Sequence, residues 1–283
     1  MQAGVEALLD KATPTQPDPL RQHVRSGSPA RNPTDAIDDG APAAPQEKPR
    51  APAGVPLSRI QRLIGARMLA SKQGKPCFYL ALGADVTELM ASRYSLSKRL
   101  GVKVTSNAFI IRALALAAAE YPLIVGRLAP LEPQDSMPTD VIRIPDHVNV
   151  GFAVNSPQGL VVPVIHEAQI RTLAEIAAQE KLLTNQARGN KLTLADLEGE
   201  TIALSNLGAF DIDTFLGIVP PPVSAILTAG KVAPTPVPRD GRVTVRKRVS
   251  LSLAVDRRIV DEAYAARFLQ AFAQRLEDPE RLV

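Results

Sequence analysis

The sequence predicts an α+β fold for one domain that begins near residue 55. Apolar residues recur with helical spacing in several segments, and runs rich in β-branched residues lie between these segments. Two turn sequences, at residues 155–159 and at Asp240-Gly241, each separate a pair of β-rich runs, which favours antiparallel hairpins. Helices and strands are therefore expected to share a single core over residues 55–283.

The N-terminal segment, residues 1–54, has the composition of a linker. It contains nine prolines and no aromatic residue. Such a segment cannot bury enough apolar surface to offset the entropy lost on ordering, so we expect a disordered, semi-extended tether.

Helices are expected where apolar side chains fall on one face of a helix with 3.6 residues per turn. Ser58 is a suitable N-cap for the first helix, and Pro122 cannot continue the third. The predicted helices run from Ser58 past Met68, from Asp85 or Thr87 to Leu100, and over residues 106–121, 173–188 and 263–276.

Strands are expected in the β-rich runs between these helices. They cover residues 78–86, 148–154, 160–165, 201–205 and 223–229, and two further runs flank Asp240-Gly241. No internal repeat is visible, which agrees with one core and not an array.

The composition resembles that of an average soluble globular protein, with 45% hydrophobic and 22% charged residues. No run of about eighteen apolar residues predicts a membrane span, and the N-terminus lacks the basic-then-apolar order of a secretory signal. Cys77 is the only cysteine, which excludes an intrachain disulfide and a zinc site made of cysteines. We expect a reducing, cytoplasmic setting, no membrane association and no metal.

The net charge of +4 is mild for this length. It suits an anionic partner such as a CoA-type nucleotide, but ordinary solubility is the simpler explanation. Basic residues surround the turn at Asp240-Gly241, namely Arg239, Arg242, Arg246, Lys247 and Arg248. No aromatic residue is interleaved with them for base stacking, so we expect a solvated hairpin and no nucleic-acid binding. A role in attracting CoA phosphates stays open.

Four strings carry a more specific signal. They are GFAV at 151–154 with GLVVPVI at 159–165, SNLG at 205–208, PPVSAILTAG at 221–230, and DRRIVDEAYAARFL at 256–269. In order and spacing they resemble the catalytic-domain signatures of the 2-oxoacid dehydrogenase acyltransferase (dihydrolipoyl acyltransferase) family, whose last string reads D-H-R-x-x-D-G-x-x-x-A-R-F-L.

The resemblance implies the fold of chloramphenicol acetyltransferase, a two-layer structure with helices flanking a mixed sheet, and assembly as a homotrimer. It implies active channels between subunits that CoA and dihydrolipoamide enter from opposite ends, and in many relatives a larger cubic core. Relatives usually carry a lipoyl domain and a peripheral subunit-binding domain, and no pattern for either is visible. A lipoyl group is therefore expected only in trans, on 2-oxoacid dehydrogenase subunits or on a lipoyl or carrier protein.

Acyl transfer between thiols needs a base for the proton of the attacking sulfur and a donor for the oxyanion of the tetrahedral intermediate. The resemblance gives the donor role to Ser205 and a site-organising role to Asp261, and Asp256 and Arg258 match a flanking pair expected to form an ion pair. Arg257 stands at the position of the family's histidine base. A guanidinium stays protonated and has no acceptor lone pair, so it cannot replace that base. Arg257 is expected to fill the site in a salt bridge, or to hold a phosphate, a carboxylate or Asp261.

Two further departures lie within the functional strings. Glu262 replaces the glycine that follows the second aspartate, and Asp211 stands where a glycine usually follows the Asn-Leu-Gly-x-Phe string. The loss of both glycines removes backbone freedom and adds bulk and charge where a close approach is needed. These changes favour a core protein with impaired catalysis and a structural or regulatory role.

The alternative is an active acyltransferase with non-standard chemistry, in which the thiolate arrives deprotonated or another base acts. His166, which follows a predicted strand, is the candidate substitute base, whereas His147 is expected to be a strand-end residue. Cys77 has small apolar neighbours and is expected to be a core thiol and not a nucleophile. Ser205 and Asp261 support this alternative, and the acyl group stays open.

Overall fold

The computed structural model describes residues 54–130, 140–157 and 159–283. Residues Pro56–Val283 form one compact unit. The predicted linker, residues 1–54, lies outside the described residues except for Gly54, so its disorder stays a prediction.

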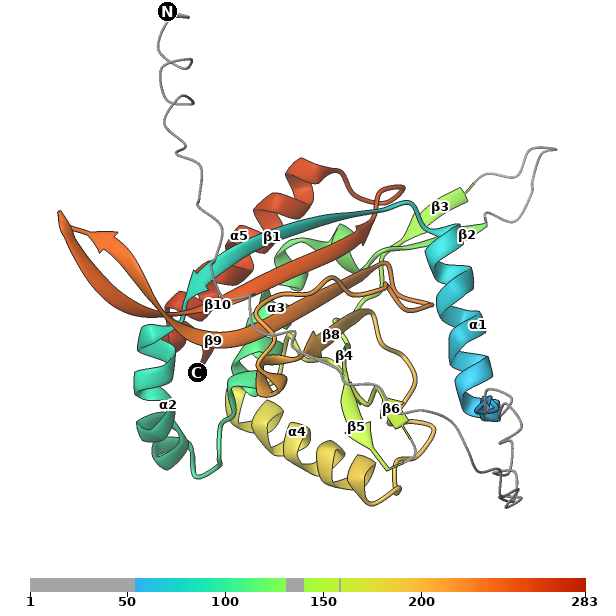
Figure 1. Ribbon diagram of the computed structural model, residues 1–283, viewed down its shortest axis with the longest axis horizontal. Helices are drawn as coiled ribbons and strands as arrows, with labels where there is room; N and C mark the ends of the chain where they lie inside the picture. Colours follow the sequence, from blue (N-terminus) through green and yellow to red (C-terminus); the bar gives the residue numbers. More distant parts are fainter. Residues whose placement is uncertain (1–53, 131–139, 158) are drawn as a thin grey trace, which may run out of the picture. The chain divides into compact units, whose positions relative to one another are not determined.

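A mixed six-stranded sheet forms the centre of the domain (Figure 1). Two pairs of neighbours, β8 with β4 and β8 with β9, are parallel, and the other pairs are antiparallel. The expectation of a mixed sheet with flanking helices is confirmed. In spatial order the strands are β1 (Cys77–Asp85), β10 (Arg242–Asp256), β9 (Ala225–Arg239), β8 (Ile202–Asn206), β4 (Val150–Phe152) and β7 (Val164–Ile165).

The predicted runs 148–154 and 160–165 each divide into two short strands. The first gives β4 and β5 (Val154–Ser156), and the second gives β6 (Gly159–Val161) and β7. The strands β5 and β6 pair antiparallel, so the hairpin predicted at residues 155–159 is confirmed, although it lies outside the main sheet. Another two-stranded sheet pairs β2 (Arg127–Pro130) with β3 (Asp140–Arg143).

All five predicted helices are present, as α1 (Arg59–Gly74), α2 (Thr87–Leu100), α3 (Ser106–Glu120), α4 (Leu173–Arg188) and α5 (Glu262–Glu277). Their starts follow from local chemistry. Ser58 and Thr172 each form a capping box with the residue three positions on, which satisfies backbone N–H groups that the helix leaves unpaired. Among the described residues no helix is long and apolar enough to cross a membrane.

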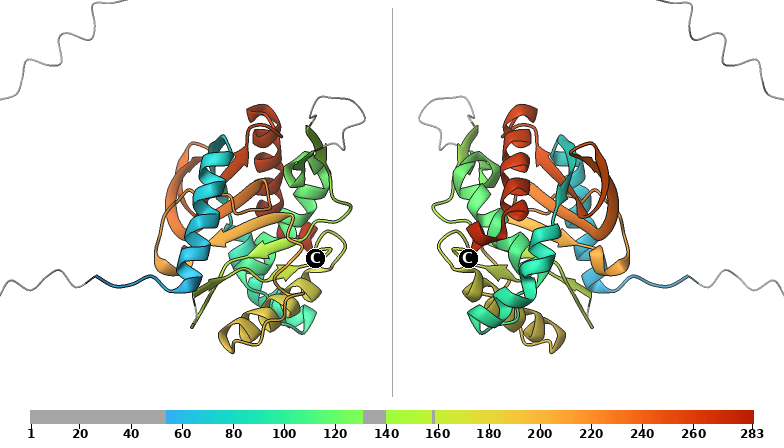
Figure 2. Two further views of the ribbon diagram at one scale, coloured as in Figure 1. Left: turned by 90° about the vertical axis from the view of Figure 1, so that its right-hand side faces the viewer. Right: turned by 90° about the vertical axis from the view of Figure 1, so that its left-hand side faces the viewer.

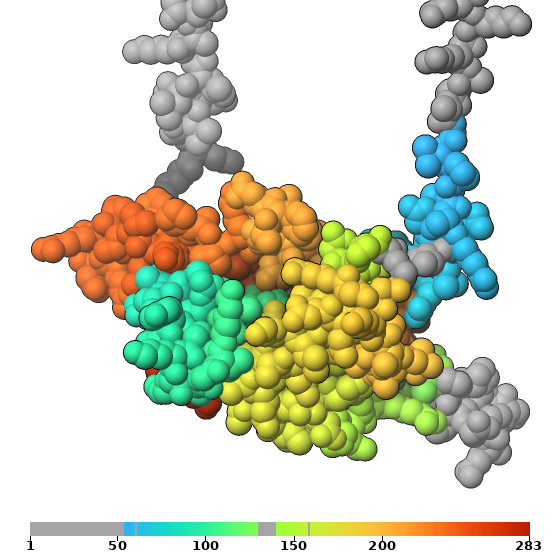
Figure 3. All heavy atoms as spheres, turned by 90° about the horizontal axis from the view of Figure 1, so that it is seen from below, coloured from blue at the N-terminus to red at the C-terminus, as the bar shows by residue number. Residues whose placement is uncertain are grey.

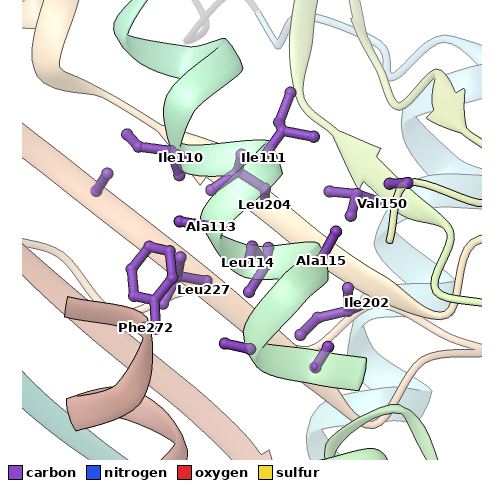
Figure 4. Close-up of a cluster of buried hydrophobic side chains, with 14 of the residues drawn as sticks. Ile110, Ile111, Ala113, Leu114, Ala115, Val150, Ile202, Leu204, Leu227 and Phe272 are labelled. Carbon is purple, nitrogen blue, oxygen red and sulfur yellow. The ribbon is translucent and has the colours of Figure 1, made fainter. Parts of the chain in front are cut away.

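One face of the sheet carries the main hydrophobic core, under α3, α4 and α5. Side chains alternate along a strand, so Ile202 and Leu204 of β8 point to this face. Figure 4 shows them beside the buried face of α3, with Leu227 of β9 and Phe272 of α5. Each fully buried side chain of this size contributes roughly 1.5–3 kcal/mol of burial free energy.

The other face is partly covered by an irregular segment, residues 211–223, which we call the strap, and α1 contacts this segment. A smaller apolar cluster lies between the strap and the sheet and includes Val219 and Val223 of the strap and Ile226 of β9. The Ser71 hydroxyl of α1 donates to the Val219 carbonyl oxygen at 2.5 Å, and this contact holds α1 on the strap. In the side views of Figure 2, strands of the sheet separate α1 from α3.

The strand predicted at residues 223–229 and the run predicted before Asp240-Gly241 form one continuous strand, β9. β9 and β10 each run for 15 residues and meet at Asp240-Gly241, where both residues have positive φ as the turn sequence predicts. Beyond the strands that flank it the hairpin continues as a two-stranded arm, which projects beside α2 in Figure 3. Its basic residues are partly paired, because Arg246 bridges to Asp85 at 2.7 Å and to Glu88 at 3.3 Å.

The packing of the strap on β9 can be tested at a glycine. A Cβ added at Gly230 would lie 1.9 Å from the Asp213 carbonyl oxygen, so we expect Gly230→Ala to lower the free energy of unfolding by about 1–3 kcal/mol. Gly65, in the exposed part of α1, is the matched control, since a Cβ there meets nothing within 4 Å. Gly65→Ala should stabilise by about 0.5–1 kcal/mol. Urea unfolding measures both, and a neutral Gly230→Ala would contradict the packing.

Candidate active site

Ser205, the predicted oxyanion donor, lies near the end of β8. Side chains alternate between the two faces of a strand, and those of Ile202 and Leu204 face the main core. The Ser205 side chain therefore points to the strap face. The strand register places Ser205 beside Thr228, and Thr228 beside Ser252, as a row of three hydroxyl residues across β8, β9 and β10. Within the described part of the chain the Ser205 hydroxyl makes no hydrogen bond, so it is free to donate to a ligand.

The other two hydroxyls of the row hold the strap. The Thr228 hydroxyl donates to the Phe215 carbonyl oxygen at 2.8 Å, and the Thr214 and Ser252 hydroxyls lie 3.2 Å apart. This role of the two hydroxyls was not predicted from the sequence. The available signal was a threonine and a serine at matching positions in two otherwise apolar strands, since a buried hydroxyl needs a partner.

The turn after Ser205 is fixed from the opposite side. The Asn206 side chain accepts from the Gly208 N–H at 2.9 Å and donates to Asn107 at 3.5 Å. Asn107 in turn donates to Glu180, a buried residue of α4 that also accepts from the Thr105 hydroxyl at 2.5 Å. Burial raises the pKa of the Glu180 carboxyl, although these two donors oppose that shift. This polar network was also missed, because its members are far apart in sequence.

Asp211 ends the short helix that follows Ser205 and has φ of 60°. The position therefore needs the left-handed conformation that glycine adopts freely and that aspartate tolerates better than most residues. The Asp211 carboxylate lies 3.0 Å from the Lys231 ammonium. The expected charge at this position is present, but it is paired with a lysine of β9.

Arg257, at the position of the family's histidine, lies in the turn between β10 and α5. Its Nε donates to the Glu262 carboxylate at 2.9 Å, and the two side chains are 50% and 59% exposed. Two of the departures found in the sequence are therefore in contact with each other. Glu262 is the first residue of α5 and does not have positive φ, so its backbone adopts a conformation that is open to any residue.

Asp261, the predicted organising residue, caps α5. Its carboxylate accepts from the Tyr264 N–H at 2.7 Å, and aspartate is among the favoured residues at this position. From the sequence, the partner expected for Arg257 was a phosphate, a carboxylate or Asp261. In the structure the partner is a carboxylate, that of Glu262, which follows Asp261 in the chain.

The expected pair of Asp256 and Arg258 is confirmed. Asp256 is 1% exposed and accepts from both the Nε and the NH2 group of Arg258, the latter at 2.6 Å. Cys77 lies opposite Asp256 in the sheet and is partly exposed. Burial and the Asp256 carboxylate raise the pKa of the Cys77 thiol, which supports a packing role over a nucleophilic one.

A single chain does not bring Ser205 and Arg257 together. Ser205 is in register with Ser252, which lies two strands away in β10. Arg257 follows Ser252 by five residues and lies just past the end of β10. At about 3.3 Å per residue and 4.8 Å per strand, the two Cα atoms are roughly 19 Å apart. Each chain thus presents the two halves of the predicted site at opposite ends of its sheet.

His166, the candidate substitute base, joins neither half. It follows β7, four strands from β10, and is roughly 19 Å from Arg257 by strand spacing. Its Nε2 lies 3.1 Å from the Ala195 carbonyl oxygen. His147 precedes β4 as expected for a strand-end residue and lies 3.5 Å from Glu167. Among the described residues no group of three or more His, Cys, Asp or Glu side chains is arranged to hold a metal.

The protein-family model for the 2-oxoacid dehydrogenases acyltransferase catalytic domain matches residues 49–283 of this chain. The chain belongs to this acyltransferase family. It is 33% identical over 229 residues to the dihydrolipoyllysine-residue acetyltransferase component of the pyruvate dehydrogenase complex of Rickettsia felis, and the match covers 80% of this chain and 53% of that protein. A mitochondrial component 3 from Arabidopsis thaliana is 33% identical over 257 residues, which are 86% of this chain and 46% of that protein. The acyltransferase-family chain therefore spans about half the length of these relatives.

Solved structures agree with this assignment. A dihydrolipoamide acetyltransferase of Azotobacter vinelandii, described for the role of a serine, a histidine and an asparagine in its catalytic mechanism, has a TM-score of 0.75 and 30% identity. The cubic core of a pyruvate dehydrogenase multienzyme complex has a TM-score of 0.74 at 30% identity. Both matches cover 86% of this family member and 99% of the other chain.

The two adjacent arginines should differ in their effect on stability. Arg258→Met leaves the buried Asp256 carboxylate without its guanidinium, so we expect it to lower the free energy of unfolding by about 3 kcal/mol. Arg257→Met removes a half-exposed pair and should cost about 0.5 kcal/mol. Urea unfolding of both variants is the measurement, and equal losses would show that burial does not separate the two roles.

Proposed function

We propose that this chain is a trimer-forming core protein of a 2-oxoacid dehydrogenase-type complex in which acyl transfer is strongly impaired. The observation that carries the proposal is the ion pair between Arg257 and Glu262 at the position of the family's base. The guanidinium holds its proton throughout the physiological range, so the proton of an attacking thiol has no acceptor there.

Sequence spacing supports the placement of this site. In the Azotobacter protein the serine precedes the histidine by 52 positions, and the asparagine follows the histidine by four. In this chain Ser205 precedes Arg257 by 52 positions, and Asp261 follows Arg257 by four. We infer that Ser205, Arg257 and Asp261 occupy the corresponding places, with an aspartate in place of the asparagine and an arginine in place of the histidine.

The geometry of the single chain supports a site shared between subunits. The half with Ser205 and the half with Arg257 lie at opposite ends of the sheet, so one chain alone cannot assemble both around one substrate. Large apolar side chains of the turn after Ser205 and of the strap are exposed, with Phe210 63% and Leu216 57% accessible. A neighbouring subunit that covers them would bury apolar surface and complete the site. A cubic core built from such trimers is a further step of the same proposal.

A second candidate function is an active acyltransferase that moves an acyl group between CoA and the thiol of a lipoyl group or carrier protein. The unpaired Ser205 hydroxyl favours it, because an oxyanion donor must be free to meet its substrate. Ser205 would donate to the thioester oxygen, Asp261 would hold the turn that carries Arg257, and His166 of another subunit would be the base. We propose a cytoplasmic location for either function.

The assembly has a direct test. The full chain at micromolar concentration should elute as a homotrimer, or a multiple of three, in size exclusion with light scattering. Leu216→Asp, which places a charge on the exposed apolar segment, should lower the trimer fraction by at least tenfold. Lys191→Asp, on the surface at the end of α4, is a control for added charge. A wild-type monomer would contradict the assembly.

The chemistry is tested by acetyl transfer from acetyl-CoA to dihydrolipoamide at pH 7. General-base catalysis contributes about 10²- to 10⁴-fold, so the chain should be slower than a histidine-bearing relative by that factor, or roughly 3 to 5.5 kcal/mol of barrier. Turnover at an ordinary enzymatic rate of about 10 per second would contradict the proposal that acyl transfer is impaired.

The same assay can restore the family's residues. Arg257→His alone should recover little, because Glu262 and Asp211 still add charge and bulk beside the site. The triple change Arg257→His, Glu262→Gly and Asp211→Gly should recover more than the sum of the single changes, since residues that act as a unit are not additive. Ser205→Ala should then remove most of the recovered rate, by about 10²-fold or more.

A further inference from the structure

The two departures at positions 257 and 262 form one interaction, and their charges have opposite effects on a sulfur anion. Arg257 presents a permanent positive charge in the turn, and Glu262 partly neutralises it at 2.9 Å. We propose that a thiol entering this site reacts only as a thiolate formed in solution, with Arg257 as its electrostatic partner and Glu262 as the residue that limits this attraction. The inference rests on the proposed placement of the acyl-transfer site at Arg257.

The groups around Arg257 supply charge but no suitable proton acceptor. At the start of α5 the ionisable residues are the N-cap Asp261 and Glu262, and at the start of β1 they are Lys75 and Cys77. Asp256 and Arg258 flank Arg257 in the chain. The carboxylates of Asp256 and Asp261 are engaged by Arg258 and by the Tyr264 N–H. Lys75 donates to the Val223 carbonyl oxygen at 2.5 Å, and an ammonium group offers no acceptor for a proton.

Among the described residues, Glu262 is the carboxylate that pairs with Arg257, and it is a poor base for a thiol. Its own backbone N–H and Arg257 hold the pKa of the Glu262 carboxyl below its ordinary value. A thiol has a pKa of about 8.5, so proton transfer to such a carboxylate is unfavourable by at least about 10⁴-fold. General-base catalysis from this cluster therefore contributes little.

A guanidinium beside a sulfur favours the charged form and lowers the thiol pKa. The charge also attracts the thiolate once it has formed. Because the Arg257 side chain is half exposed and paired, water and Glu262 both weaken this attraction. Removal of one charge should therefore change the rate by a modest factor, roughly three- to tenfold.

The reaction step balances without a base in the protein. The thiol loses its proton to water or hydroxide before it binds. The thiolate sulfur attacks the thioester carbonyl carbon, one carbon–sulfur bond forms, and the carbonyl oxygen becomes an oxyanion that the Ser205 hydroxyl of a neighbouring subunit stabilises. Collapse of this intermediate breaks the bond to the CoA sulfur, which leaves as a thiolate and takes a proton from water.

A pH profile separates this route from one that uses an imidazole. The full chain is assayed with acetyl-CoA and dihydrolipoamide between pH 6 and 9, and the rate without protein is subtracted at each pH. We expect kcat/KM to rise about tenfold per pH unit as long as the pH stays below the pKa of the attacking thiol. A plateau above about pH 6.5 that disappears in His166→Gln would overturn the proposal, because an imidazole would then be the base.

Single charge removals give a second readout, since a merely structural ion pair would respond differently. Arg257→Gln should lower kcat/KM at pH 7 by roughly three- to tenfold, and Glu262→Gln should raise it by a similar factor. If the pair only shaped the turn, both changes would lower the rate. Arg99→Gln is the matched control, because Arg99 and Glu280 also lie 2.9 Å apart with 53% and 62% exposed side chains, and this change should leave the rate unaltered.

Failure of the inference is distinguishable from failure of the proposed function. If no transfer above the uncatalysed rate is found even at pH 9, the thiolate route is wrong, while the impaired core protein stands. If transfer at pH 7 is fast and independent of Arg257, both are wrong. Loss of rate in both Arg257→Gln and Glu262→Gln overturns the inference alone.

Discussion

The antiparallel pairing of β9 with β10 determines where each half of the candidate site lies. β9 carries the chain away from the row of hydroxyls, and β10 returns it past that row to the end of the sheet where β8 and β9 begin. Arg257 emerges there, far from Ser205. Because the register of two 15-residue strands is fixed by many hydrogen bonds and by the buried side chains on one face, this separation cannot relax within one chain. Chemistry that needs both residues must be completed by another subunit.

The same sheet explains why Ser205 is both held and free. Its strand is fixed on the core face by Leu204 and on the far face by the strap, which passes so close to β9 that Gly230 has no room for a side chain. Thr228 and Ser252 use their hydroxyls to fasten the strap, whereas Ser205, at the end of the row, keeps its hydroxyl unpaired within the described residues. A rigid frame with one free donor is what oxyanion stabilisation requires.

Local signals predicted most elements, and long-range contacts account for what was missed. The helix α4 has the bounds predicted from its capping residues and periodicity, and the Asp240-Gly241 turn fixed its hairpin. The strand at residues 223–229 and the run before Asp240 were predicted as separate strands, but they are continuous in β9. Pro234, Pro236 and Pro238 fit this strand because, among the described residues, its outer edge has no strand partner there. The strap has no periodicity, and the Glu180 network joins residues more than 70 positions apart. A salt bridge of Arg257 was predicted, but Glu262 was not named as its partner, because the geometry of the turn that joins them is not visible in the sequence.

Adjacent arginines show how burial assigns different roles to the same side chain. The Asp256 carboxylate is 1% exposed, so Arg258 is needed to balance a charge that water cannot reach. The Glu262 carboxylate is 59% exposed, and water would solvate it well without Arg257. The helix start is already capped by Asp261, so the turn does not depend on this pair either. Little stability therefore rests on Arg257, and the main physical consequence of an arginine at this position is the charge that it presents to whatever enters the site.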